Sequence, residues 1–141
     1  MRTALVGLAA ILLCFTTSCA WRKPVAPIKQ RIVLHGIVDF NKSKIRPDSL
    51  PLVEEAAGML KENEHLHVLV EGHSDAKGDE AYNKKLSLRR ARAVRDSLMA
   101  LGVSSDQILV VGKGASEPVA SNETRAGRAQ NRRVQLQVYQ E

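Results

Sequence analysis

The chain has 141 residues, a formal charge of +6 and 44% hydrophobic residues. This length suffices for one domain with a hydrophobic core and excludes two domains of ordinary size. Aromatic residues make up only 4%, so the core must consist mainly of Leu, Val, Ile and Ala, and base-stacking surfaces for nucleic acid are scarce. A basic balance suits an anionic polymer or lipid surface.

The N-terminal segment has the pattern of a secretory leader. Arg2 precedes an apolar run, residues 4–15, which at about 12 residues is too short to span a bilayer. Small residues follow and end at Cys19, as in a bacterial lipobox. We therefore predict a lipoprotein signal peptide over residues 1–18 and a lipidated N-terminus with a Pro-containing linker over residues 19–30.

Two other processing routes remain open for this segment. Cleavage after Ala20 by ordinary signal peptidase would leave a soluble protein that starts at Trp21, and an uncleaved leader would act as an anchor. The only other cysteine, Cys14, also lies in the leader, so the domain has no cysteine for a disulfide or a metal site. If Cys19 is lipidated, Ala20 after it resembles the signal for outer-membrane sorting.

The first half of the domain predicts two strands with a helix between them. Residues 31–40 are rich in Ile, Val and Leu and predict a strand. Pro47 marks the start of an amphipathic helix that extends to about Asn63. Residues 65–72 predict the second strand, with one face more apolar than the other.

The second half predicts a long helix followed by two strands. The helix covers about residues 80–101 and ends at Gly102. A short apolar strand over residues 108–111 follows, and after a polar loop residues 124–129 predict a helical turn. Residues 133–139 alternate strictly and predict a final strand that is buried on one face.

These elements predict one α/β (α+β) domain over residues 31–141. Their order is β-α-β-α-β-β, and the sheet is expected to be mixed, with helices packed on one face.

The long helix places one charged side chain among its apolar residues. Of its four arginines, only Arg90 falls on the apolar stripe, and Asn83 lies two turns earlier on the same face. A helix rarely directs an arginine toward its core side without a polar partner. Asp75, in the loop before the helix, is the nearest candidate.

Two hypotheses explain this arrangement. In the first, Asp75 and Arg90 form a structural ion pair that closes the loop over the helix. In the second they form a split site, in which Arg90 binds a ligand carboxylate and Asp75 binds a ligand ammonium. The spacing alone slightly favours the structural pair.

Four segments of the chain resemble signature blocks of one family. They are DFNKSKIRP at 39–47, GHSDAKG at 72–78, YNKKLSLRRA at 82–91 and GRAQNRRV at 127–134. In this order they resemble the OmpA-like peptidoglycan-binding domain family, over about residues 35–139.

The resemblance implies a ligand and a set of residues that bind it. In the family, the positions of Asp75 and Arg90 bind the diaminopimelate residue of the peptidoglycan stem peptide. Asn83 and the turn around Asn41 are expected to line the pocket, and Ser74 keeps the hydroxyl where the family usually has Thr. Two further arginines are weaker candidates, Arg128 and Arg133.

The implied function is a non-catalytic outer-membrane lipoprotein that faces the periplasm and tethers the membrane to peptidoglycan. The expected partners are peptidoglycan and, through Cys19, the lipid of the outer membrane. The alternative is an envelope protein-interaction module of the same fold, in a Tol-type or other trans-envelope complex.

Catalysis, metal binding and nucleic-acid binding have weaker support. His73 lies close to Asp75, and His65, His67 and Glu71 alternate along one strand, but no metalloprotease motif or nucleophile elbow is present. The basic run between residues 125 and 133 lacks aromatic partners and indicates a solvated face. We predict no enzyme activity, no metal, no cofactor and no nucleic-acid partner.

Overall fold

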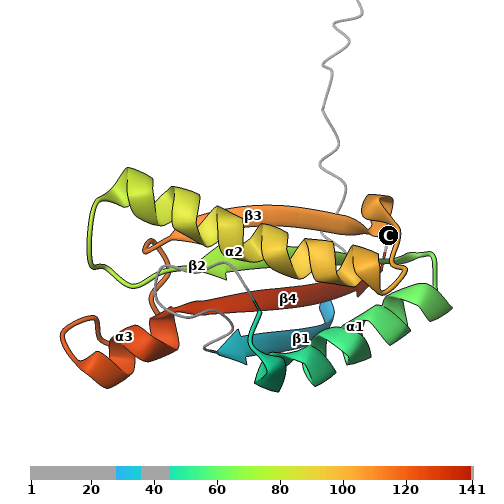
Figure 1. Ribbon diagram of the computed structural model, residues 1–141, viewed down its shortest axis with the longest axis horizontal. Helices are drawn as coiled ribbons and strands as arrows, with labels where there is room; N and C mark the ends of the chain where they lie inside the picture. Colours follow the sequence, from blue (N-terminus) through green and yellow to red (C-terminus); the bar gives the residue numbers. More distant parts are fainter. Residues whose placement is uncertain (1–27, 36–44, 141) are drawn as a thin grey trace, which may run out of the picture.

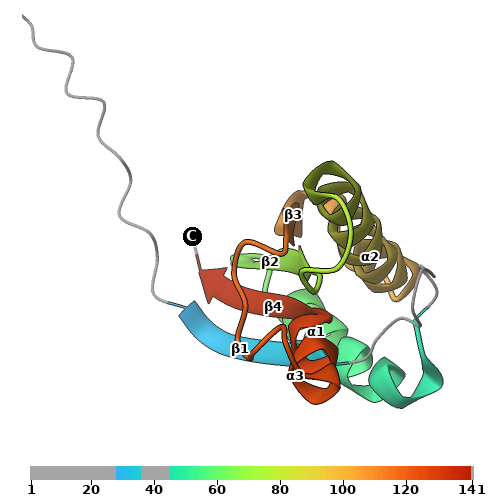
Figure 2. The ribbon, with the colours of Figure 1, turned by 90° about the vertical axis from the view of Figure 1, so that its left-hand side faces the viewer.

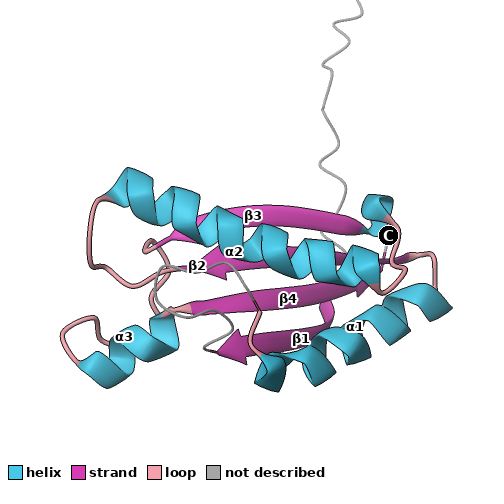
Figure 3. Ribbon diagram, viewed as in Figure 1, coloured by secondary structure: helices cyan, strands magenta, loops and turns pink. Residues whose placement is uncertain are grey.

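The computed structural model describes residues 28–35 and 45–140. Within these ranges the chain forms a four-stranded sheet with two helices across one face and a third at one end (Figure 1, Figure 3). The strands are β1 Ile28–His35, β2 Leu66–His73, β3 Ile108–Gly114 and β4 Arg133–Gln140. The helices are α1 Leu50–Glu62, α2 Glu80–Ala100 and α3 Arg125–Asn131.

The sheet is mixed, as the sequence predicts. Its strand order is β1-β4-β2-β3, in which β2 pairs parallel with β3 and antiparallel with β4. The helix α2 is the crossover between the two parallel strands and packs on both of them. Figure 2 shows α1 and α2 on the same side of the sheet, and no helix of the described residues covers the other face.

The core lies between the sheet and these two helices. Alternate strand side chains point toward the helices and are buried there: Ile32, Leu34, Val68, Val70, Ile108, Val134, Leu136 and Val138. On β4 the side chains that alternate with them, Gln135, Gln137 and Tyr139, are half-buried on the opposite face. The predicted alternation of the last strand is therefore confirmed.

Several element boundaries differ from the predicted ones. The strand β1 begins at Ile28, because its backbone pairs with β4 at Ile28 and again from Gln30 onward, with a register shift between them. Residues 36–40, predicted to continue that strand, lie outside the described residues. The predicted helical turn near residue 124 is a seven-residue helix, α3, whose N-cap Thr124 accepts a hydrogen bond from the Gly127 amide at 3.0 Å.

The strand β3 continues to Gly114, beyond the predicted end at residue 111, because its backbone pairs with β2 as far as His73. Glycines at this end of the two strands let α2 approach the sheet closely. A Cβ atom on Gly72 of β2 would lie 1.9 Å from the Ser87 carbonyl oxygen, and one on Gly112 would lie 2.7 Å from the Leu88 nitrogen. The Ser87 hydroxyl also accepts a hydrogen bond from the Gly114 amide at 2.9 Å. These contacts fix α2 over the ends of β2 and β3.

No helix in the described ranges has the length and apolar character needed to cross a bilayer.

A matched pair of glycine substitutions tests the close contact between α2 and the end of β2. Gly72→Ala should lower the free energy of unfolding by about 1–3 kcal/mol or more, because the added methyl group meets the backbone of α2. Gly58→Ala, in α1 with open space around it, should instead raise that free energy by about 0.5–1 kcal/mol. Urea denaturation measures both. If Gly72→Ala were as stable as the wild type, the proposed close contact would not exist.

Candidate ligand-binding site

The carboxylate of Asp75 is held by its own loop and by the residue before β4. Its side chain is buried, its Oδ1 accepts a hydrogen bond from the Lys77 amide at 3.0 Å, and its Oδ2 is 2.8 Å from Nη1 of Arg132. The next amide, of Ala76, donates to Oδ1 of Asn122 at 3.1 Å. The loop after β2 is thus anchored both to itself and to the segment that precedes α3.

Arg90 is 3% exposed and lies on the core side of α2, as the helical spacing predicts. Its Nη1 donates one long hydrogen bond, 3.5 Å, to the His73 carbonyl oxygen. Its Nε and Nη2 have no hydrogen-bond partner among the residues that the structure describes. Burial lowers the pKa of Arg90, the neighbouring charge of Arg132 lowers it further, and Asp75 opposes both. A buried cation with unused donors favours an anionic ligand.

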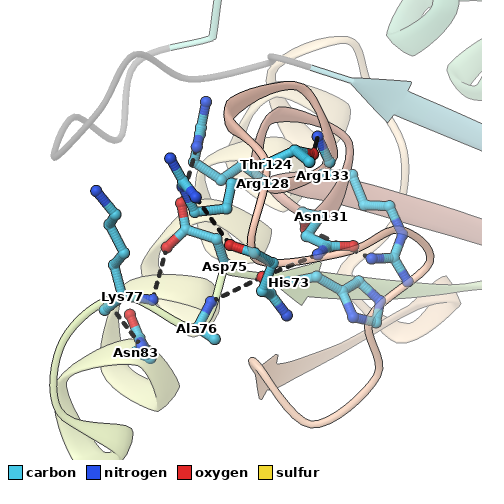
Figure 4. Close-up of polar contacts among 12 residues, drawn as sticks. His73, Asp75, Ala76, Lys77, Asn83, Thr124, Arg128, Asn131 and Arg133 are labelled. Atoms are coloured by element: carbon cyan, nitrogen blue, oxygen red, sulfur yellow. Dashed lines mark hydrogen bonds and ion pairs between the residues drawn. The ribbon is translucent and has the colours of Figure 1, made fainter.

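Two more predicted residues lie beside this pair. Asn83 is buried on α2, and its Nδ2 donates to the Lys77 carbonyl oxygen at 3.0 Å. Ser74 is buried at the end of β2, and its Oγ has no hydrogen-bond partner among the described groups. Figure 4 shows how Lys77 connects the Asp75 carboxylate to the Asn83 amide through its own backbone.

These side chains line one cavity of about 40 Å³. Its lining residues are Ser74, Asp75, Lys77, Tyr82, Asn83, Leu86, Arg90 and Arg132. Four of the five predicted principal site residues therefore meet in one place. The fifth, Asn41, lies outside the described residues.

The hypothesis of a direct structural ion pair between Asp75 and Arg90 is wrong. Asp75 pairs instead with Arg132, a residue that was not among the predicted site residues. Arg132 directly precedes β4, and the only available signal was its position in the GRAQNRRV block. Sequence spacing could not distinguish it from its neighbours, because no regular element fixes the direction of its side chain.

The two weaker candidates, Arg128 and Arg133, do not line the cavity. Arg128 donates through Nη1 to the carbonyl oxygens of Asn122 and Glu123, both at 2.8 Å. Arg133 is buried and donates to the Glu117 carbonyl oxygen at 3.2 Å. Figure 4 shows Arg133 on the far side of the cluster from Lys77. Both side chains hold the loop between β3 and α3.

Asn131, which the sequence did not single out, connects that loop to the site. Its Oδ1 accepts hydrogen bonds from the amides of Val119 and Ala120, at 2.8 and 3.0 Å. Its Nδ2 donates to Oδ1 of Asn122, the same oxygen that accepts the Ala76 amide. The fully buried Asn131 thereby positions the Asp75 loop from a distance.

Of the residues that the sequence showed alternating, His67 and Glu71 lie on β2 and His65 directly precedes it. In the described ranges, no group of three His, Cys, Asp or Glu side chains is placed to hold an ion. His67 stacks on Tyr139 with ring centroids 5.7 Å apart, and Glu71 contacts Gln137 and Lys113.

The imidazole of His73 is almost completely buried, and neither ring nitrogen has a hydrogen-bond partner in the described structure. Burial is the main cause that lowers the pKa of His73 from 6.5 to about 4. The positive charges of Arg133 and Lys113 lower it too, whereas Glu117 raises it. The folded protein therefore keeps this ring neutral at pH values where an unfolded chain would protonate it.

Residues 39–132 match the model of the OmpA family. The chain belongs to the OmpA family.

Curated relatives of this family share sequence with most of the chain. Outer membrane porin F of Pseudomonas aeruginosa is 45% identical over 109 residues, which is 77% of this chain and 31% of that protein. Outer-membrane lipoprotein YfiB of the same organism is 44% identical over 98 residues, 70% of this chain and 58% of that protein. The chain therefore spans about a third of the porin and little more than half of the lipoprotein.

The fold also matches a solved structure. The crystal structure of the peptidoglycan-associated lipoprotein from Burkholderia pseudomallei superposes with a TM-score of 0.72 and 33% sequence identity. The match covers 83% of this chain and 97% of that one. The OmpA-like fold predicted from the sequence is thus confirmed.

Acid should destabilise the fold through His73. Because the folded pKa lies below the unfolded one, the unfolded state binds more protons between pH 6.5 and about 4, and stability falls as the pH falls through that window. From pH 7 to pH 5 the free energy of unfolding should drop by about 2 kcal/mol. Urea denaturation at the two pH values measures this. His73→Leu should remove most of the drop, and an unchanged drop in that variant would assign it to other groups.

Proposed function

We propose that this domain binds peptidoglycan without catalysis, by gripping the end of the diaminopimelate residue in the stem peptide. The observation that carries the proposal is the buried Arg90 guanidinium, in which two nitrogens, Nε and Nη2, have no hydrogen-bond partner among the described residues, in the same cavity as the Asp75 carboxylate. Family membership and the peptidoglycan-associated lipoprotein of similar fold support the same choice of ligand.

The far end of diaminopimelate carries one carboxylate and one ammonium group. Its carboxylate would accept hydrogen bonds from Nε and Nη2 of Arg90, a charge-assisted interaction that also relieves the cost of burying those donors. Its ammonium would donate to Asp75, whose two oxygens each accept one hydrogen bond from the described residues and can accept another. Ser74 and Asn83 would supply neutral polar contacts at the cavity wall.

We further propose that the chain is an outer-membrane lipoprotein, anchored through Cys19, whose domain faces the periplasm and tethers the membrane to the cell wall. Its similarity to an outer-membrane lipoprotein and a peptidoglycan-associated lipoprotein supports this location. Cys19 itself lies outside the described residues. An envelope protein-interaction module would share the fold, but it would not require binding to purified sacculi.

Sacculus binding tests the site. Asp75→Asn and Arg90→Gln should each lower the affinity of the full chain for diaminopimelate-type sacculi by about tenfold or more, because each removes hydrogen bonds to a charged group. Co-sedimentation measures the affinity. Two exposed residues give matched controls, Asp106→Asn and Arg125→Gln, which should bind as the wild type does. Circular dichroism identifies a variant that fails to fold.

If both site variants are folded and bind normally, the assignment of Asp75 and Arg90 is wrong. Competition also addresses the ligand: a free stem tetrapeptide with diaminopimelate at its third position should displace the wild type from sacculi, and the same peptide with lysine at that position should not. Within the peptide, the lysine side chain has an ammonium but no carboxylate at its end and would leave Arg90 without an acceptor. Equal displacement by the two peptides would contradict the role of Arg90.

A separate measurement tests the anchor. Cys19→Ser should move the protein from the membrane fraction to the soluble fraction, because the substituted residue cannot be lipidated. Cys14→Ser is the matched control and should remain in the membrane fraction. If Cys19→Ser also stays there, the leader itself is the anchor and lipidation is not required.

A further inference from the structure

The outward side of α2 carries a row of exposed cations that the proposed site does not use. At 100° per residue, Asn83, Leu86 and Arg90 face the cavity, and the basic residues fall outside that face, with Arg89 nearest to it. We call this row the α2 basic strip; it consists of Lys84, Lys85, Arg89 and Arg92, all exposed. The strip lies along the helix that Figure 1 shows across the length of the sheet.

The fold gains no stabilising ion pairs from these charges. The strip residues form no ion pair with any residue that the structure describes, whereas Arg95 on the same helix pairs with Asp96 at 2.7 Å. Lys85 and Arg89 are four residues apart and Arg89 and Arg92 three apart, spacings at which like charges on a helix repel. Lys84 and Lys85 also lie near the helix N-terminus, where the helix dipole disfavours cations.

The adjacent helix has the opposite charge pattern. The exposed residues of α1 include Glu54, Glu55 and Glu62, with Lys61 as the cation among them. The basic charge of the helical layer is therefore concentrated on α2 rather than spread over the surface. Such a concentration favours an anionic partner.

The strip starts beside the cavity. Tyr82 and Leu86 line the cavity, and Lys85 and Arg89 each follow one of them by three residues on the neighbouring flank of α2. With a rise of about 1.5 Å per residue, Arg92 lies about 15 Å along the helix axis from Tyr82. A polymer whose end group occupies the cavity would pass within reach of these cations.

We propose that the α2 basic strip binds carboxylates of the same wall polymer, outside the end group that the cavity grips. This inference rests on the proposed function. The polymer carries a carboxylate-bearing peptide at each repeat, so an extended cationic strip complements it where a single pocket does not. The strip adds salt-sensitive contacts to the specific one, and the contacts act together because they engage one molecule.

The test compares the affinity of the protein for the polymer with its affinity for a single peptide repeat. Lys85→Gln/Arg89→Gln/Arg92→Gln in the full chain should lower the affinity for diaminopimelate-type sacculi by about tenfold in dilute salt and flatten its decline with NaCl. Affinity for a free diaminopimelate-containing tripeptide should stay within about twofold of the wild type, because the cavity is intact. Thermal unfolding of this variant should occur at the wild-type temperature or above it, since like charges are removed.

A control variant with the same loss of net charge carries exposed substitutions on β1, α1 and α3: Arg31→Gln/Lys61→Gln/Arg125→Gln. It should bind sacculi with the wild-type affinity and the wild-type salt dependence. An equal loss of affinity in both triple variants would show that net charge causes the effect and would overturn the inference.

Three other results would also overturn it. They are normal sacculus binding by the strip variant, an equal loss of tripeptide binding, and a defect seen on phosphatidylglycerol vesicles but not on sacculi, which would assign the strip to a membrane surface. If the wild type binds no sacculi, the proposed function and this inference both fail. If the wild type binds sacculi, the Asp75 and Arg90 variants lose binding and the strip variant binds as the wild type does, the inference fails and the proposed function stands.

Discussion

The close contact between α2 and the glycine-containing ends of β2 and β3 is the constraint on which the rest of the site depends. Gly72 leaves room for the Ser87 backbone, and Gly112 leaves room for Leu88. With the helix at that distance, Arg90 reaches the carbonyl oxygen of His73 at the last residue of β2. A longer separation would expose Arg90 to water, where unused donors carry little cost and the site would lose its preference for an anion.

The carboxylate half of the site depends on a different set of contacts. Asp75 is in a loop, and loops hold a side chain in place only when other groups fix their backbone. Here the fixing groups come from the chain before β4: Asn131 holds Asn122, Asn122 holds the Ala76 amide, and Arg132 pairs with Asp75. The GHSDAKG and GRAQNRRV segments are therefore one structural unit, although more than forty residues separate them.

The sequence predicted the features that periodicity controls. Alternation identified the buried face of β4, and helical spacing separated Arg90 from the other arginines of α2, because both patterns follow directly from backbone geometry. It did not predict Arg132 as the partner of Asp75, nor Asn131 as the residue that fixes the loop. Neither belongs to a periodic pattern, and each acts through a tertiary contact that spacing along the chain does not encode. The family resemblance pointed to the GRAQNRRV segment, in which Arg132 lines the cavity and the two predicted candidates, Arg128 and Arg133, do not.

The arrangement of charge explains how one small cavity could serve a large polymer. A cavity of about 40 Å³ accommodates only the tip of a side chain, so the cavity by itself limits the affinity for a single repeat. In the proposed complex, Arg90 inside the cavity would supply selectivity, since a buried donor discriminates strongly against ligands that lack its acceptor. The exposed cations of the α2 basic strip would supply attraction with little selectivity, because water and salt screen them. With both on one helix, a weak specific contact would act together with a weak general one, and a polymer that engages both would be held while each contact stays reversible.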